Sequence, residues 1–230
     1  MPTVVPRLVH RASGLVDLAI KNRPGVLGYR LSAAKDLDTA YTAPTAFLDV
    51  RVGDVFSSPT IQRNRAYRMN SSNRGLTRLW LDIDDYASAT IPGDDDVCFL
   101  RVSEETAGGF LEPGPILVIP PPDFFETGRR SLTLVGSAPN LASRGNSLPP
   151  ATALRVFFPK FADELKVYNE EAAGGNDLYF SFGLGSNEMR VSANSSRGFS
   201  EAGANEFLIR GDSGAVSFSI SAAIVNGIQA

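Results

Sequence analysis

The sequence predicts an all-β protein, with two β-sandwich domains in series and few or no long helices. Short apolar runs separated by turn residues recur along the chain, and 21 glycines and 15 prolines among 230 residues supply many turns. The last run shows the pattern most clearly, because Val216, Phe218 and Ile220 alternate with Ser217 and Ser219. A period of two predicts a strand with one buried face and one serine-coated face.

The first predicted domain is a β-sandwich over residues 1–123. Its expected strands are the runs 14–20, 27–31, 47–52, 76–83, 97–102 and 116–119. Turn signals such as Pro92-Gly93 lie between these runs. Pro120-Pro121-Pro122 is expected to end the last strand, because proline has no amide hydrogen to donate to a neighbouring strand. The proline-flanked residues 1–11 are expected to form an extended N-terminal arm.

A linker is expected over 124–150, followed by a second β-sandwich over 151–230. The stretch 136–150 is rich in Ser, Asn, Pro and Gly, which predicts a loop. The expected strands after it are 154–158, 164–169, 178–182, 189–191, 207–210 and 216–225. The helical signals are the short runs 159–169 and 30–37, of which the first also fits a strand. We expect the N-terminal arm or the loop 136–150 to be ordered only against a neighbouring chain.

The composition limits the classes of function. With 43% hydrophobic residues the chain can form cores, and its net charge of −3 argues against a protein that binds nucleic acid phosphates. The one cysteine, Cys98, lies in an apolar run and is expected to be a buried thiol of a protein folded in a reducing cytoplasm. The sequence shows no signal peptide and no apolar run long enough to span a membrane, so a soluble protein is expected.

Two motifs overlap in the segment 210–214. Gly211-Asp212-Ser213-Gly214 matches the nucleophile motif of chymotrypsin-like proteases, but the only histidine, His10, lies in an unrelated sequence context. Arg210-Gly211-Asp212 spells the integrin-binding tripeptide. A tight turn between two strands accounts for both. Since nucleotide, dinucleotide and metal motifs are also missing from the sequence, we expect no cofactor and no enzymatic activity.

Two charged segments are candidates for binding. The aspartates Asp82, Asp84, Asp85 and Asp94–Asp96 would chelate Ca²⁺ if the two loops faced one another, or would form a solvated hairpin loop. The second is a basic segment over residues 63–78, which contains several arginines. With its aromatic neighbours it fits either contact with an acidic partner or one face of a solvated loop. The interface candidates in and beside this segment are Arg63, Arg65, Tyr67, Arg68 and Trp80.

Two parts of the chain show a family resemblance. Cys98-Phe99-Leu100-Arg101-Val102 and the segment 114–122 resemble the final two strands of a fibronectin type III-like sandwich. The strands 154–161, 165–169, 178–182 and 219–225 resemble the β-sandwich of small virion proteins of tailed bacteriophages. The second resemblance rests on about 75 residues and carries no catalytic residues.

The resemblance implies a virion structural protein, assembled in the host cytoplasm. Its expected role is that of a capsid decoration or cement protein, with the major capsid protein or other virion proteins as partners and without contact to nucleic acid or membrane. A homo-oligomer is implied, with a trimer favoured. The alternatives are a neck, tail or fibre-anchoring protein, a carbohydrate-binding adhesin with Trp80 and Tyr86 as its aromatic platform, and a glycan hydrolase with a carboxylate pair.

Overall fold

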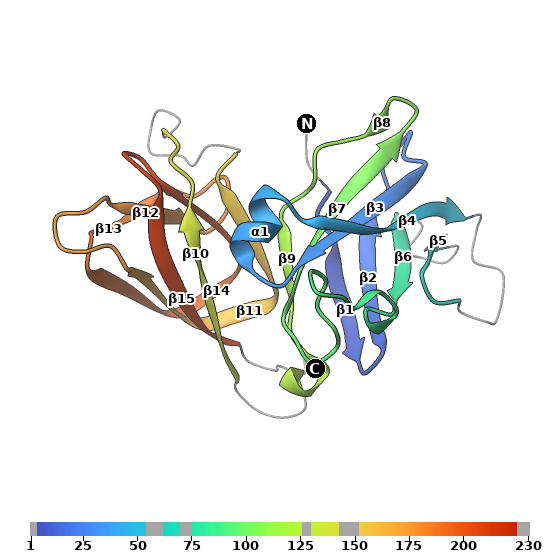
Figure 1. Ribbon diagram of the computed structural model, residues 1–230, viewed down its shortest axis with the longest axis horizontal. Helices are drawn as coiled ribbons and strands as arrows, with labels where there is room; N and C mark the ends of the chain where they lie inside the picture. Colours follow the sequence, from blue (N-terminus) through green and yellow to red (C-terminus); the bar gives the residue numbers. More distant parts are fainter. Residues whose placement is uncertain (1–3, 54–61, 70–74, 126–129, 143–151, 225–230) are drawn as a thin grey trace. The chain divides into compact units, whose positions relative to one another are not determined.

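The structure is a computed structural model, and it describes residues 4–53, 62–69, 75–125, 130–142 and 152–224. The prediction of an all-β fold is confirmed, since strands dominate the described chain (Figure 1). The helical elements are α1 (Leu37–Thr42), η1 (Asp84–Tyr86) and η2 (Pro122–Phe125). The chain divides into two compact units, residues 1–35 with 39–124 and residues 36–38 with 125–230.

The described residues of the first unit form nine strands in two connected sheets. They are β1 (Arg7–Ala12), β2 (Leu15–Lys21), β3 (Gly28–Ala34), β4 (Thr45–Gly53), β5 (Arg65–Arg68), β6 (Leu76–Leu81), β7 (Cys98–Thr106), β8 (Gly109–Phe110) and β9 (Ile116–Ile119). One sheet has the order β1-β2-β6-β5, and the other has the order β4-β3-β7-β9 with β8 added to β7. The end of β4 also pairs with β5 in parallel, so one strand joins both sheets.

The core of the first unit lies between these sheets. Leu18 and Leu79 come from the first sheet, while Leu31 and Val102 come from the second, and all four are fully buried. Polar contacts also cross the interior, because Tyr29 of β3 shares a side-chain hydrogen bond with Thr77 of β6. The two sheets therefore pack face to face as a sandwich.

The second unit is built on two long strands. Its elements are β10 (Arg130–Ala138), β11 (Leu154–Asn169), β12 (Leu178–Ser181), β13 (Met189–Val191), β14 (Ser195–Gly211) and β15 (Val216–Ile224), in the order β10-β15-β11-β14-β12-β13. The pairing of β11 with β14 breaks between Phe157 and Glu164. Such irregularities bend a strand. The two halves of this long strand pair, β11 with β14, thereby belong to opposite layers.

Aromatic side chains join these layers. Phe180 of β12 lies 5.1 Å from Phe199, at the opposite half of β14, between ring centroids. Phe182 contacts Phe199 and Phe207 at 5.3 and 5.7 Å, and Phe158 contacts Phe207 at 5.2 Å. The alternation of the final strand is confirmed, since Val216, Phe218, Ile220, Ala222 and Ile224 are buried while the residues between them are at least partly exposed.

The prediction of an N-terminal arm that needs a neighbouring chain is wrong for residues 4–12. Residues Arg7–Ala12 form β1, which pairs with β2 in the same unit. Val4 and Pro6 are buried without any neighbouring chain. The segment is ordered because its amides join a sheet and its apolar side chains enter the local core.

Two further differences concern the predicted linker and helices. Residues Arg130–Ala138 form β10, paired with β15 along its length, so this part of the predicted linker 124–150 is a strand of the second unit. Residues 143–150 of the predicted loop lie outside the described residues. The run 159–169 belongs to β11, and the run 30–37 is mostly strand β3, with helix α1 beginning only at Leu37.

Candidate functional site

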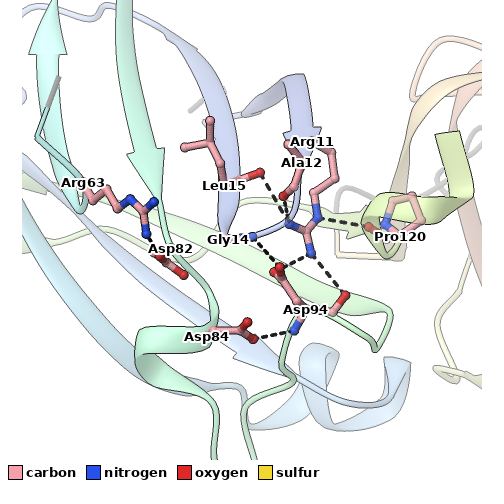
Figure 2. Close-up of polar contacts among 9 residues, drawn as sticks. All are labelled: Arg11, Ala12, Gly14, Leu15, Arg63, Asp82, Asp84, Asp94 and Pro120. Atoms are coloured by element: carbon pink, nitrogen blue, oxygen red, sulfur yellow. Dashed lines mark hydrogen bonds and ion pairs between the residues drawn. The ribbon is translucent and has the colours of Figure 1, made fainter. Parts of the chain in front are cut away.

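The most connected polar site of the first unit is centred on Arg11 and Asp94 (Figure 2). Nη2 of Arg11 donates to Oδ1 of Asp94 at 2.8 Å, and Nε donates to the carbonyl oxygen of Pro120 at 3.3 Å. Nη1 donates to the carbonyl oxygen of Ala12 at 2.7 Å. The other carboxylate oxygen of Asp94 accepts the amide of Gly14. Both side chains are buried, so this pair fastens β1 and its turn to the body of the unit.

The electrostatics of Asp94 fit this structural role. Burial opposes ionisation, but the Gly14 amide and the Arg11 guanidinium outweigh it and hold the pKa of Asp94 below its ordinary value of 3.8. Asp84 receives the amide of Asp94 at 2.7 Å, which fixes the loop that carries Asp94. The carboxylate is therefore ionised and engaged at neutral pH.

The other aspartates of the acidic cluster are also occupied in part by protein groups. Arg63 pairs with the buried Asp82, and Asn64 donates to Asp85 at 3.0 Å. In the described part of the chain, no group of three or more His, Cys, Asp or Glu is placed to hold a metal ion. The description as a solvated loop is wrong for Asp82 and Asp94, which are buried. The Ca²⁺ alternative gains no site among these residues.

The interface candidates divide between the surface and the interior. Arg63, Arg65 and Arg68 are exposed, and Tyr67 is half-buried. Trp80 is only 7% exposed, and its ring lies 5.5 Å from that of Tyr67. Trp80 is therefore unsuitable as an exposed contact or as an aromatic platform for a sugar, and that part of the prediction is wrong.

The segment 210–214 is a turn, as predicted, because β14 ends at Gly211 and β15 begins at Val216. Arg210 is 2% exposed and forms a two-pronged ion pair with Glu188, with N–O distances of 2.7 and 2.6 Å. Its guanidinium also lies 4.5 Å from the ring centroid of Tyr179. A receptor for the Arg-Gly-Asp tripeptide needs an accessible arginine, which this turn does not present. The hydroxyl of Ser213 is bonded to the side chain of Asp212 at 2.9 Å.

Two further titratable groups are buried in the first unit. Burial raises the pKa of the Cys98 thiol to about 12, so the thiol is protonated and unreactive, as the sequence predicted. Glu104 is also buried, and Oε2 pairs with Arg23 while Oε1 has no hydrogen-bond partner among the described residues. Desolvation raises the pKa of Glu104 above 4.5, against the opposing effect of Arg23.

An exposed apolar patch surrounds the β7–β8 hairpin of the first unit. We call Leu27, Arg30, Phe110 and Leu111 the hairpin-tip patch. The three apolar members are 43, 38 and 37% exposed in that order, and they are three of six large apolar side chains exposed to this degree in the described chain. The guanidinium of Arg30 lies 3.9 Å from the ring centroid of Phe110 and is held by a two-pronged pair with Asp49 at 2.8 and 2.7 Å.

The backbone places the members of this patch together. Phe110 lies opposite Glu105 in the hairpin, and the amide of Leu27 donates to the carbonyl of Glu105 at 2.8 Å. The amide of Leu111 donates to the carbonyl of Glu104 at 2.9 Å. Phe110 and Leu111 are neighbours on an extended segment, so their side chains point to opposite faces of the hairpin. Sequence reasoning missed this patch, although the Gly108-Gly109-Phe110-Leu111 sequence marks a turn followed by apolar residues.

Comparisons with protein-family models, curated proteins and solved structures find no match to this chain. Among the described residues, no helix has the length and apolar character needed to cross a membrane.

Proposed function

We propose that this chain is a non-enzymatic structural protein of a tailed-bacteriophage virion that docks on other virion proteins as a decoration or cement protein. The virion assignment is supported by the resemblance of the second unit's strands to small virion proteins. The docking role is supported by the hairpin-tip patch. The homo-oligomer, favoured as a trimer, and assembly in the host cytoplasm belong to the same proposal.

The composition of the hairpin-tip patch suits a protein interface. Three exposed apolar side chains and an arginine lie on or beside this one hairpin, and aromatic residues and arginine are enriched among the residues that dominate binding. Arg30 is already held over Phe110 by Asp49, so little side-chain freedom remains to be lost on binding. Apolar groups on both faces of a narrow hairpin suit insertion into a partner's groove.

Residues of the receptor tripeptide and of the candidate Ca²⁺ cluster serve structural contacts instead. Arg210 is paired in the interior, and Asp94 fastens β1. These assignments leave the hairpin-tip patch as the surface feature that best supports a function. The neck, tail or fibre-anchoring alternative uses the same docking chemistry with a different virion partner.

The test is incorporation into particles. Density-purified virus particles carrying the wild-type gene are expected to contain this chain in a fixed ratio to the major capsid protein, measured by quantitative mass spectrometry. Phe110→Ser and Leu111→Ser are expected to reduce incorporation by about tenfold or more, because each removes an apolar contact worth about 1.5–3 kcal/mol when buried. Native mass spectrometry of the purified chain measures its oligomeric state.

Leu184→Ser is the matched control. Leu184 is 38% exposed, as Phe110 is, but lies in the second unit outside the patch. This variant is expected to be incorporated like the wild type. A chain that is strictly monomeric and absent from particles would overturn the virion assignment, and equal incorporation of all the variants would overturn the role of the patch.

A further inference from the structure

The second unit carries a shallow groove on the outer face of its β10-β15-β11-β14 sheet. Its volume is about 580 Å³, within the range of pockets that take small ligands. Its lining residues include Ser131, Glu164, Lys166, Tyr168, Gly198 and Ser221. All of them belong to the second unit.

The strand pairing explains the shape of this groove. Lys166 of β11 lies between Ser221 of β15 on one side and Gly198 of β14 on the other. The long side chains of β11 therefore stand beside rows of very small residues. On β15 the outward-facing residues are Ser217, Ser219, Ser221 and Ala223. These four alternate positions span roughly 20 Å along the strand.

The wall of the groove combines the hydroxyl groups of Ser131, Tyr168, Ser200 and Ser221 with the apolar side chains of Leu165, Phe199 and Ala223. The backbone amides and carbonyls of a central strand such as β11 are used in pairing on both sides, so a ligand must be recognised by side chains. Serine hydroxyls both donate and accept hydrogen bonds, as the hydroxyls of a sugar do. Tyr168 adds a half-buried aromatic ring, with the ammonium of Lys166 4.6 Å from its centroid.

The charges select among ligand classes. Glu164 and Lys166 are both exposed and adjacent on the same face, so their charges balance. A balanced pair gives no net attraction for a polyanion such as nucleic acid or for a polycation. Apolar side chains stand beside the hydroxyl groups in the wall, and a sugar ring presents both an apolar face and hydroxyl groups to such a surface. What fits best is a neutral, hydroxyl-rich ligand that lies along the strands.

We propose that this groove binds a neutral oligosaccharide, with Lys166, Tyr168 and the serine hydroxyls as its contacts. The site differs from the Trp80 platform expected from the sequence, and it is independent of the docking proposed for the hairpin-tip patch. A virion protein with this groove would bind surface glycans of cells or of the medium in addition to its structural role.

The test titrates the full-length, ¹⁵N-labelled chain with hexasaccharides of β-linked glucose, xylose, mannose and N-acetylglucosamine at millimolar concentration. At least one hexasaccharide is expected to shift the amide signals of Lys166, Gly198 and Ser221. Lys166→Ala and Tyr168→Ala are expected to weaken binding about tenfold each, as the loss of a hydrogen bond to a charged group or of a stacked ring implies. Binding is expected to change little with salt, because the ligand is uncharged.

A pair of glycine variants separates the groove from the rest of the unit. Gly198 and Gly185 are both exposed, and a Cβ atom added at either meets no atom within 4 Å, so neither substitution clashes at its Cβ. Gly198→Leu fills the groove and is expected to abolish binding, whereas Gly185→Leu lies outside the groove and is expected to bind like the wild type.

Three results would overturn the proposal. They are the absence of shifts with all four hexasaccharides, binding that Gly198→Leu leaves intact, and salt-sensitive binding of dextran sulfate in place of the neutral sugars. If the same amides shift only when protein concentration is raised, a second copy of the chain occupies the face. None of these outcomes bears on incorporation into particles, so the two proposals fail separately.

Discussion

The two units solve the problem of packing two β layers in different ways. In the first unit, the described residues include five buried charged ones: Arg11, Asp17, Asp82, Asp94 and Glu104. In the second unit, the described residues bury the charged side chains of one ion pair, Arg210 with Glu188, and a cluster of phenylalanine rings occupies the interior. A buried ion pair contributes less to stability than apolar packing of similar volume, but it is costly to break from one side.

This difference follows from how the layers are joined. In the first unit, loops and short strands must be fixed at defined positions, and directional contacts such as Arg11 to Asp94 do so. In the second unit, two continuous strands pass from one layer to the other, so the connection is already covalent. The interior is then filled mainly by apolar side chains, beside the one ion pair of Arg210 with Glu188. We expect the first unit to respond to charge and pH, and the second to respond to the loss of volume.

The largest effect is expected for Phe180→Ala in the second unit. Phe180 is fully buried and contacts Phe182 and Phe199. Truncation should cost about 3–5 kcal/mol of unfolding free energy through lost burial and the cavity left behind. Hydrogen exchange of β12 and β14 measures it. In a parallel denaturant titration, the fluorescence of Trp80, the only tryptophan, reports on the first unit. Loss of protection confined to the first unit would contradict the assignment.

The next largest effect is expected for Arg11→Met, which should lower the unfolding free energy by about 3 kcal/mol. The substitution leaves the buried carboxylate of Asp94 without its cation. Denaturant titration followed by Trp80 fluorescence measures the loss. Arg7→Met, an exposed position of the same strand, is the control and should change stability by less than about 0.5 kcal/mol. If the two variants were equally stable, the ion pair would not be what fastens β1.

A smaller effect is expected for Arg210→Lys, which should lower the unfolding free energy of the second unit by about 1.5 kcal/mol. Lysine keeps the charge but cannot reproduce the two-pronged contact with Glu188 or the stacking on Tyr179. Exchange protection of β13 and β14 measures the change. Arg190→Lys provides a comparison at an exposed pair with Asp177 in the same unit. A loss at position 190 equal to that at 210 would show that burial does not matter here.

The sequence predicted the strands whose pattern is strong. The alternation of Val216, Phe218 and Ile220, and the stop at Pro120, both reflect local rules of side-chain direction and backbone donors. For residues of β10 the sequence predicts a linker instead, because Gly136 and Ser137 begin a stretch typical of loops. In the structure a Cβ atom added at Gly136 would lie 3.1 Å from the side chain of Leu37 and 3.4 Å from that of Phe218, so a larger residue would be crowded. Only the tertiary neighbours explain that glycine.

Site prediction depended still more on partners distant in sequence. Arg11 and Asp94 are separated by 83 positions, and no local pattern joins them. Trp80 alternates with Leu79 and Leu81, which suggested a solvent-facing aromatic, but Tyr67 of β5 covers it. The serine face of β15 was visible in the sequence. The groove it forms was not, because the groove also requires Lys166 and Gly198 from two other strands.

The last prediction concerns the pH dependence of the first unit and is the smallest in size. Burial raises the pKa of Glu104 above 4.5 in the folded state, so the folded state holds this proton more tightly than the unfolded chain does. Protonated Glu104 therefore stabilises the folded state below pH 4.5, and this contribution is lost as the pH rises from 4.5 through the folded pKa.

The variant Glu104→Gln tests this. Its side chain cannot ionise, so its unfolding free energy relative to wild type should rise between pH 4.5 and the folded pKa. Denaturant titrations followed by Trp80 fluorescence measure this, with the exposed Glu112→Gln as the charge control. The lowered pKa of Asp94 acts below 3.8, outside this interval. Parallel profiles for wild type and Glu104→Gln above pH 4.5 would show that the buried carboxylate does not set the pH response of the first unit.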